Sequence, residues 1–181
     1  MECSINFYNF SGKYGFLSPT SPYEIVIKRV AYPTLSHYIQ RTKLSMYGFS
    51  NIRINRIMND CNILRIRNNV NLLCKNTDKW RLARYSVVKN ATIAKFEQNR
   101  DILVKLCGSI GKFRYLSQDK YWGYTGDNEM GKLIGVVRSE MISKYPSLVT
   151  EKLDKLYLLK RKEEAPPDEA PPDEAPPDEA P

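Results

Sequence analysis

Residues 163–181 repeat the pentapeptide EAPPD, and this repeat limits how much of the chain can fold. Paired prolines lack backbone N–H donors and have a fixed φ, so the segment can neither continue a helix nor join the interior of a sheet. Its side chains are acidic, Ala or Pro, and such a composition cannot bury a core. We therefore predict one folded domain over 1–162 and a disordered acidic tail over 163–181, which aids solubility or screens the domain.

The charge of the chain is divided unevenly between this domain and its tail. The formal net charge is +8, but the tail carries eight acidic residues and no basic ones, so the domain itself carries +16. A domain this basic favours partners that bear phosphate, which are either nucleic acid or a phosphorylated small molecule. Composition does not choose between these two classes.

The cysteines and the hydropathy of the chain favour an intracellular protein. The four cysteines are widely spaced, there is no CxxC pair, and the chain has a single His. The sequence thus predicts no metal site and no cofactor, and we expect four buried, reduced thiols. No run of 18 apolar residues and no signal-peptide pattern occurs. We expect a cytoplasmic protein that does not bind membranes.

Hydrophobic spacing predicts a mainly helical domain. A helix is expected to start at Pro33 and Thr34 and to run from Leu35 to about Met46. Further helices are predicted over 52–66, 86–106, 133–142 and 147–162. Before residue 33, two short strands joined by a loop are predicted, with a β-branched run at Ile25–Ile27. The fold class is α+β: one mainly helical domain with a small antiparallel sheet.

The helix over 35–46 carries two stripes of side chains. An apolar stripe recurs at helical spacing and is expected to be buried: Leu35, Ile39, Thr42 and Met46. Ser36, Gln40 and Lys43 form a neighbouring stripe that offers a hydroxyl, an amide and a cation, which suits a sugar or a phosphate. The alternative is a solvated helix face. His37 lies off this stripe, and we interpret it as a hydrogen-bonded structural residue rather than a base.

A glycine-containing loop that follows the third predicted helix holds a second candidate group. Asp119, Asp127 and Glu129 lie around Trp122 in this loop. An aromatic side chain can stack on a nucleobase, and carboxylates can bind ribose hydroxyls or activate water. The alternative is an ordinary acidic loop with a packing Trp. Trp80 is either a second stacking side chain or part of the core.

Six short motifs occur in one order along the chain: YGFLS at 14–18, YPTxxHYxQxxK at 32–43, KW at 79–80, AKFEQN at 94–99, DxxWG at 119–123 and GxxxGxVR at 131–138. In this order and spacing the chain resembles the NADAR family over roughly residues 5 to 142. The resemblance implies the fold of that family and an N-glycosidase activity. Members hydrolyse N-glycosidic bonds of phosphoribosyl intermediates of riboflavin synthesis, or remove ADP-ribose from guanine bases.

The resemblance also shows which family residues this chain lacks. The family pattern at the first helix is Trp-Pro-Thr-x-Glu-His-Tyr, and its Glu is thought to be catalytic. Here Tyr32 stands for the Trp and Ser36 for the Glu. Tyr124 stands where some members have an acidic residue, and a Glu expected shortly before Asp119 is absent. Ser is not ionised at neutral pH, so it can neither deprotonate water nor stabilise an oxocarbenium ion by its charge.

The candidate site combines the residue patterns with this resemblance. The candidate catalytic residues are Asp119, Asp127 and Glu129. The residues expected to bind substrate are Gly15, Phe16, Ser36, Gln40, Lys43, Trp80, Trp122 and Gly123. The expected partner is a phosphoribosyl or ADP-ribosyl molecule, free or attached to a base. Two alternatives stay open: a binding module of the same fold that does not turn its ligand over efficiently, and a basic protein associated with nucleic acid.

Overall fold

The computed structural model describes residues 3–75 and 78–148. The expected tail lies outside these residues, and so do all but the first two residues of the helix predicted over 147–162. Among the described helices, none is long and apolar enough to cross a membrane.

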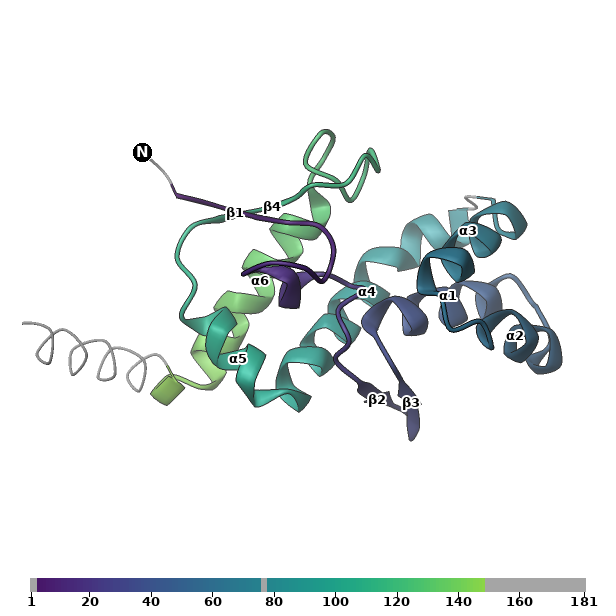
Figure 1. Cartoon of the computed structure of the whole chain (residues 1–181), viewed down its shortest axis with the longest axis horizontal. Helices are drawn as coiled ribbons and strands as arrows, with labels where there is room; N and C mark the ends of the chain where they lie inside the picture. The colour runs from purple at the N-terminus through teal and green to yellow at the C-terminus, as the bar shows by residue number, and fades with distance from the viewer. Residues whose placement is uncertain (1–2, 76–77, 149–181) are drawn as a thin grey trace, which may run out of the picture.

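The helices form two groups that are joined by one long helix, α4 (Figure 1). The α-helices of the described residues are α1 (Leu35–Met46), α2 (Asn51–Met58), α3 (Ile63–Leu73), α4 (Asp78–Gln98), α5 (Arg100–Cys107) and α6 (Glu129–Lys144), and a short 3-10 helix, η1 (Gly15–Leu17), precedes α1. α1, α2 and α3 lie at one end of α4, and α5 and α6 lie at its other end (Figure 1). The molecule therefore has a junction beside α4 where the two groups meet.

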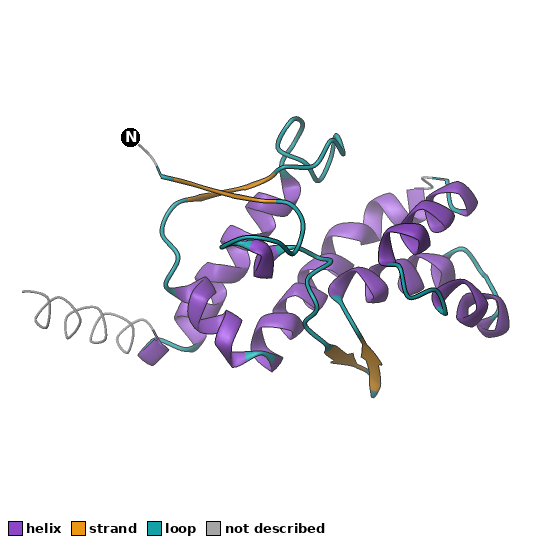
Figure 2. Ribbon diagram, in the orientation of Figure 1, coloured by secondary structure: helices purple, strands orange, loops and turns teal. Residues whose placement is uncertain are grey.

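The strands form two separate pairs (Figure 2). β2 (Ile25–Ile27) and β3 (Val30–Tyr32) are antiparallel, and the turn between them has positive φ at both Lys28 and Arg29, as a tight hairpin turn requires. β1 (Ser4–Phe7) pairs in parallel with β4 (Lys112–Tyr115), which packs on α6. The predicted class, a mainly helical α+β domain with a small sheet, is confirmed. The parallel pair was not predicted.

Two predicted helices are each divided by a turn. The helix expected over 52–66 is α2 followed by α3, because the Asn62 side chain accepts the backbone N–H groups of Leu64 and Arg65 and so starts a new helix. The helix expected over 86–106 is the end of α4 followed by α5, with Asn99 between them. Unlike Asn62, Asn99 precedes its helix without a side-chain cap hydrogen bond.

The start of α1 confirms the prediction made from Pro33 and Thr34. The Thr34 side chain accepts the backbone N–H of His37 at 3.3 Å, as an N-cap does. The same hydroxyl lies 2.8 Å from Nδ1 of His37. Burial lowers the pKa of His37, so the ring is neutral at pH 7. His37 thus fixes the helix start, in agreement with its interpretation as a structural residue.

Two apolar clusters form most of the core. The larger lies between β1, β4, α4, α5 and α6 and includes Phe96, Phe113 and Leu133. The smaller joins α1, α2 and α3 through Leu44 and Ile54, among others. A third, small cluster of Ile25, Leu35 and Ala91 packs β2 and α1 on α4. Beside it, polar side chains on the facing sides of the two helical groups line a space.

The structure corrects the expectation that all four cysteines are buried. Cys74 and Cys107 are buried, whereas Cys3 and Cys61 are exposed. The two exposed residues lie outside helices and strands, where the chain does not pack on the core. Within residues 3–75 and 78–148, no group of three or more His, Cys, Asp or Glu side chains is arranged to hold a metal ion.

Candidate functional site

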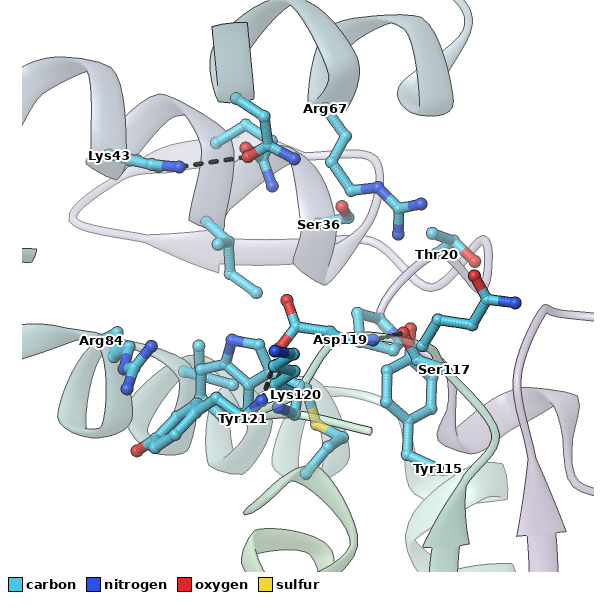
Figure 3. Close-up of a pocket in the computed structure, with 18 of the residues that line it drawn as sticks. Thr20, Ser36, Lys43, Arg67, Arg84, Tyr115, Ser117, Asp119, Lys120 and Tyr121 are labelled. Atoms are coloured by element: carbon cyan, nitrogen blue, oxygen red, sulfur yellow. Dashed lines mark hydrogen bonds between the residues drawn. The ribbon is translucent and has the colours of Figure 1, made fainter. Parts of the chain in front are cut away.

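A cavity of about 1030 Å³ lies at the junction of the two helical groups. Its walls come from α1, α3, α4, the loop after β4, and residues 19–20, so segments that are far apart in the sequence face one another across it (Figure 3). A space of this size holds a nucleotide. The residues that surround it therefore define a candidate site.

The α1 wall of the cavity is the polar stripe of that helix. Ser36, Gln40 and Lys43 line the cavity and are only 4%, 6% and 6% exposed. The stripe is therefore not a solvated helix face. Ile39, Thr42 and Met46, which were expected to be buried, are half-buried, because the core side of α1 is centred on Leu35 and Leu44 instead. Oε1 of Gln40 has no hydrogen-bond partner among the described residues, so this buried oxygen can receive a donor from a ligand.

Lys43 presents its amine to the cavity beside an indole. Nζ donates to Oδ1 of Asn71 at 3.1 Å and lies 5.9 Å from the ring centre of Trp80. Burial lowers the pKa of Lys43, and the nearby Cys74 and Asp119 partly oppose this shift. The amine therefore lies beside an aromatic ring, and the carboxylate of the opposite wall favours its charged form.

The loop after β4 presents Asp119 to the cavity. One carboxylate oxygen, Oδ1, accepts the backbone N–H groups of Tyr121 and Trp122, both at 2.9 Å. The other oxygen points across the cavity toward α1 (Figure 3). Gly123 makes this tight turn possible, because a Cβ there would overlap the carbonyl oxygen of Ser117. Oδ1 of Asp119 thus stabilises the loop, and the second carboxylate oxygen is available to a ligand in the cavity.

The loop returns to α6 through Asn128. This residue has φ of 53°, a left-handed conformation that Asn tolerates better than most residues. Its side chain accepts the backbone N–H of Tyr115 at 3.1 Å and donates to the carbonyl of Phe113 at 2.9 Å. Asn128 therefore pairs with β4 in the way a neighbouring strand would, and it fixes both ends of the loop that carries Asp119.

The charges around the cavity are strongly unequal. Of the described residues that line it, Asp119 alone is acidic, and five side chains are cationic: Lys43, Arg67, Lys75, Arg84 and Lys120. Such a surplus in a partly enclosed space attracts anions. The cavity therefore suits a ligand with phosphate groups and has one carboxylate for chemistry.

Aromatic side chains line the cavity near the start of α4. Trp80 is 5% exposed, and Trp122 is half-buried with its ring edge-on to Tyr121 at 4.7 Å between centres. The guanidinium of Arg84 lies 3.3 Å from the centre of the Tyr121 ring. Its Nε is buried and has no hydrogen-bond partner among the described residues. These rings offer planar surfaces to a base.

Lys95 holds the segment that borders the cavity at residues 19–20. Its amine is buried, with 1% of the residue exposed. Nζ donates to the carbonyl of Phe16 at 2.7 Å, to the carbonyl of Ser18 at 2.8 Å and to Oγ of Ser21 at 2.7 Å. Three acceptors match the three hydrogens of an ammonium group. This cation therefore fixes the backbone of the segment.

The fixed segment is tied to α1 as well. The carbonyl of Pro19 accepts the backbone N–H of Ser36 at 2.8 Å. Gly15 is needed upstream, because a Cβ there would overlap the carbonyl oxygen of Phe10. Lys95 and Gly15 therefore act on the cavity by shaping its wall, and neither lines it.

We expect Lys95→Met to lower the free energy of unfolding by about 1–3 kcal/mol, because it leaves buried acceptors unpaired. Burial lowers the pKa of Lys95 to about 7 from its ordinary value of 10.5. Between these values the unfolded chain binds more protons than the folded protein, so wild-type stability rises with pH. The stability difference between wild type and Lys95→Met should therefore grow from pH 7 to about 9.5 in urea denaturation.

Lys89→Met is the matched control for this prediction, because Lys89 lies on the same helix but pairs with Glu140 near the surface. Tyr23, whose ring centre lies 5.7 Å from Nζ of Lys95, has its pKa raised, mainly by burial, and stays protonated over this range. A Lys95→Met variant as stable as Lys89→Met, with no change in the difference over pH, would contradict the structural role of Lys95.

Several residues proposed from the sequence are brought together, and others are not. The cavity is lined by Ser36, Gln40, Lys43, Trp80, Asp119 and Trp122. Gly15, Phe16, Gly123, Asp127 and Glu129 do not line it. Asp127 is exposed, and Glu129 pairs with Lys132 at 2.7 Å in the first turn of α6. Their carboxylates are thus placed away from the cavity that Asp119 faces.

Four cationic residues of the cavity were not identified from the sequence: Arg67, Lys75, Arg84 and Lys120. Each is one of many basic residues in the domain, and no local motif separates them from the others. Their shared location results from the packing of α3, α4 and the loop after β4 around one space. The positive net charge of the domain predicted a partner that bears phosphate, but it did not indicate which basic residues would contact that partner.

The sequence has clear relatives. The NADAR domain model matches residues 4–142. The chain is 29% identical to the N-glycosidase YbiA of Shigella sonnei (strain Ss046) over 144 residues, which cover 76% of this chain and 88% of that protein. It is 28% identical to the N-glycosidase YbiA of Escherichia coli (strain K12), with the same coverage. A riboflavin biosynthesis protein of Vibrio vulnificus (strain YJ016) is 25% identical over 167 residues, which cover 85% of this chain and 43% of that protein.

A solved structure shares the fold. The NMR structure of the E. coli protein YbiA superposes with a TM-score of 0.67 at 23% sequence identity, over 79% of this chain and 87% of that one.

Proposed function

Because the chain belongs to the NADAR family, we propose that its cavity binds a phosphoribosyl or ADP-ribosyl ligand and hydrolyses the N-glycosidic bond between ribose and base. The observation that carries this proposal is the position of Asp119, a single carboxylate in a cationic cavity lined by aromatic rings. The names of the relatives agree with it, since they include N-glycosidases and a riboflavin biosynthesis protein.

The chemistry of the bond explains why one carboxylate matters. As the C1′–N bond breaks, its electron pair leaves with the base and positive charge develops on the ribose. The free carboxylate oxygen of Asp119 is suited to stabilise this charge and to accept a proton from the water that attacks C1′. The departing nitrogen takes up a proton, so hydrolysis yields a free base or amine together with ribose phosphate or, from an ADP-ribosyl ligand, ADP-ribose. General-base help of this kind contributes about 10²–10⁴ in rate.

The remaining lining residues support binding. Trp80 and Trp122 offer faces for the base, and Gln40 offers the unpaired oxygen that can accept an exocyclic N–H. Lys43 can donate to a ring nitrogen or carbonyl of the base and so stabilise the negative charge that forms as it leaves. In this assignment Ser36 supplies only a hydrogen bond.

A second function is favoured by one observation, which is Ser36 on the α1 wall. It stands where the resemblance places a catalytic Glu, and its hydroxyl cannot act as a base at neutral pH. A protein with this substitution can bind the ligand and turn it over slowly or not at all. The two functions share the cavity and differ in the rate of bond cleavage.

A release assay tests the hydrolytic function. A phosphoribosylamino-pyrimidine and an ADP-ribosylated guanine oligonucleotide are incubated with excess protein, and free ribose phosphate or ADP-ribose is measured. We expect release from at least one of them above the rate without protein. Saturable binding without release would identify the binding module, and neither binding nor release would contradict the proposed function.

We expect Trp122→Ala to weaken ligand binding by about 1–3 kcal/mol, the value typical of a base stacked on an aromatic side chain. The measurement is calorimetric titration together with a thermal melt. Tyr124→Ala is the control, because Tyr124 lies in the same loop but is exposed and contacts Arg114 instead of the cavity. If Trp122→Ala unfolds the domain while a folded Trp80→Ala binds normally, both indoles serve the core and the base binds elsewhere.

A further inference from the structure

The cavity has two chemically different ends. At one end, the amine of Lys43 lies beside the Trp80 indole. At the other end, the guanidinium of Arg67 points from α3 into the cavity, on the side where Thr20 and Ser117 lie (Figure 3). One end therefore combines a cation with a planar ring, and the other combines a cation with hydroxyl groups.

Asp119 lies between these ends. In the close-up its carboxylate lies between Lys43 on one side and Arg67 on the other (Figure 3). Its charge opposes the lowering of the Lys43 pKa by burial, which agrees with this position. A ligand that spans the cavity has its middle at the carboxylate.

Arg67 lies beside Tyr115, with which it shares a side-chain hydrogen bond. The residue is half-buried, and no carboxylate of residues 3–75 and 78–148 forms a salt bridge with it, so its charge is available to an anion. Arg65, two residues earlier on the same helix, pairs with Asp60 at 3.8 Å and lies outside the cavity. A planar guanidinium binds phosphate through two parallel hydrogen bonds, and hydroxyl groups around it can donate to the remaining oxygens. The Arg67 end therefore fits a phosphate, whereas the Trp80 end fits a base.

We propose that Arg67 binds the ribose 5′-phosphate, so that the ligand lies with its base at Trp80 and its C1′ atom beside Asp119. This inference rests on the proposed function and specifies the orientation of the ligand. It makes the 5′-phosphate a recognised group, and it assigns Arg67 a role in specificity rather than in bond cleavage. Ligands that lack the phosphate then lose a contact at one end and keep the base contacts at the other.

The test uses pseudouridine 5′-monophosphate and pseudouridine, whose C1′–C bond cannot be hydrolysed as an N-glycosidic bond is. Wild type should bind the monophosphate more tightly than the nucleoside. Arg67→Met should reduce affinity for the monophosphate about 10-fold and leave affinity for the nucleoside unchanged. Arg65→Met, the matched control, should change neither, and Arg67→Lys should keep part of the preference because it keeps the charge. Isothermal titration measures these four proteins and Lys43→Met, and a thermal melt verifies that each is folded.

Two results would overturn the inference while the proposed function stands. In the first, Arg67→Met binds both ligands as wild type does. In the second, Lys43→Met removes the preference for the monophosphate and Arg67→Met does not, which means that the phosphate lies at the Trp80 end. A wild type that binds neither pseudouridine compound, and that fails to bind or cleave the substrates of the release assay, would overturn the proposed function and the inference with it.

Discussion

Asp119→Asn is expected to slow release of ribose phosphate by about 10²–10⁴, because it removes the carboxylate that faces the reacting bond. Asn retains a side-chain oxygen that can accept the N–H groups of Tyr121 and Trp122, so the loop should keep its shape. Ligand binding should therefore change little. The measurement is the first-order rate of release at saturating protein, together with a binding titration on the same variant.

Asp127→Asn and Glu129→Gln are the controls for this prediction. Both residues were candidate catalytic residues from the sequence, and both lie outside the cavity. We expect both variants to retain the wild-type rate. If Asp127→Asn or Glu129→Gln slows release and Asp119→Asn does not, the reacting bond lies against the far side of the loop, and the assignment of Asp119 is wrong.

Ser36→Glu is expected to raise the rate of release by about 10-fold or more, because it supplies a second carboxylate on the α1 wall. Ser36 lines the cavity, so a longer side chain can extend into that space. Lys43, two turns along the same face, helps to keep the new carboxylate ionised. The measurement is the release rate of wild type and variant with the phosphoribosylamino-pyrimidine.

Ser36→Gln separates the effect of charge from the effect of size. Gln has the shape of Glu and no ionisable group, so it should give no increase. An equal increase in both variants would mean that the longer side chain improves the position of the ligand. No increase in either, with binding retained, would mean that Asp119 already supplies all the general-base help that this cavity can use.

Local signals were enough to identify α1 and its polar stripe. An N-cap and an amphipathic repeat act within a few residues, so Thr34 and the spacing over 35–46 define the helix from sequence alone. The same spacing places Ser36, Gln40 and Lys43 on one side. Whether that side meets solvent or a cavity depends on α3 and the loop after β4, which no local pattern specifies.

Features that depend on distant contacts were not predicted. β4 forms because residues 112–115 pair with residues 4–7, which lie near the N-terminus of the chain. The sequence of residues 112–115 alone resembles a loop. Arg67 was missed because no local pattern separates it from the other basic residues, and it reaches the cavity only because α3 packs on α1. Asp127 was a candidate because it is an acidic residue in a glycine-containing loop. In the structure its backbone N–H donates to the carbonyl of Lys120 and its side chain is exposed.

The most direct test of the cavity as the ligand site is an NMR titration of ¹⁵N-labelled protein with pseudouridine 5′-monophosphate. The chain has two Trp residues, so two indole N–H signals report on the cavity. We expect both indole signals to shift, together with the backbone signals of Ser36, Gln40, Lys43 and residues 119–122. Shifts confined to the exposed basic residues of α2, or no shifts at millimolar ligand, would contradict the account.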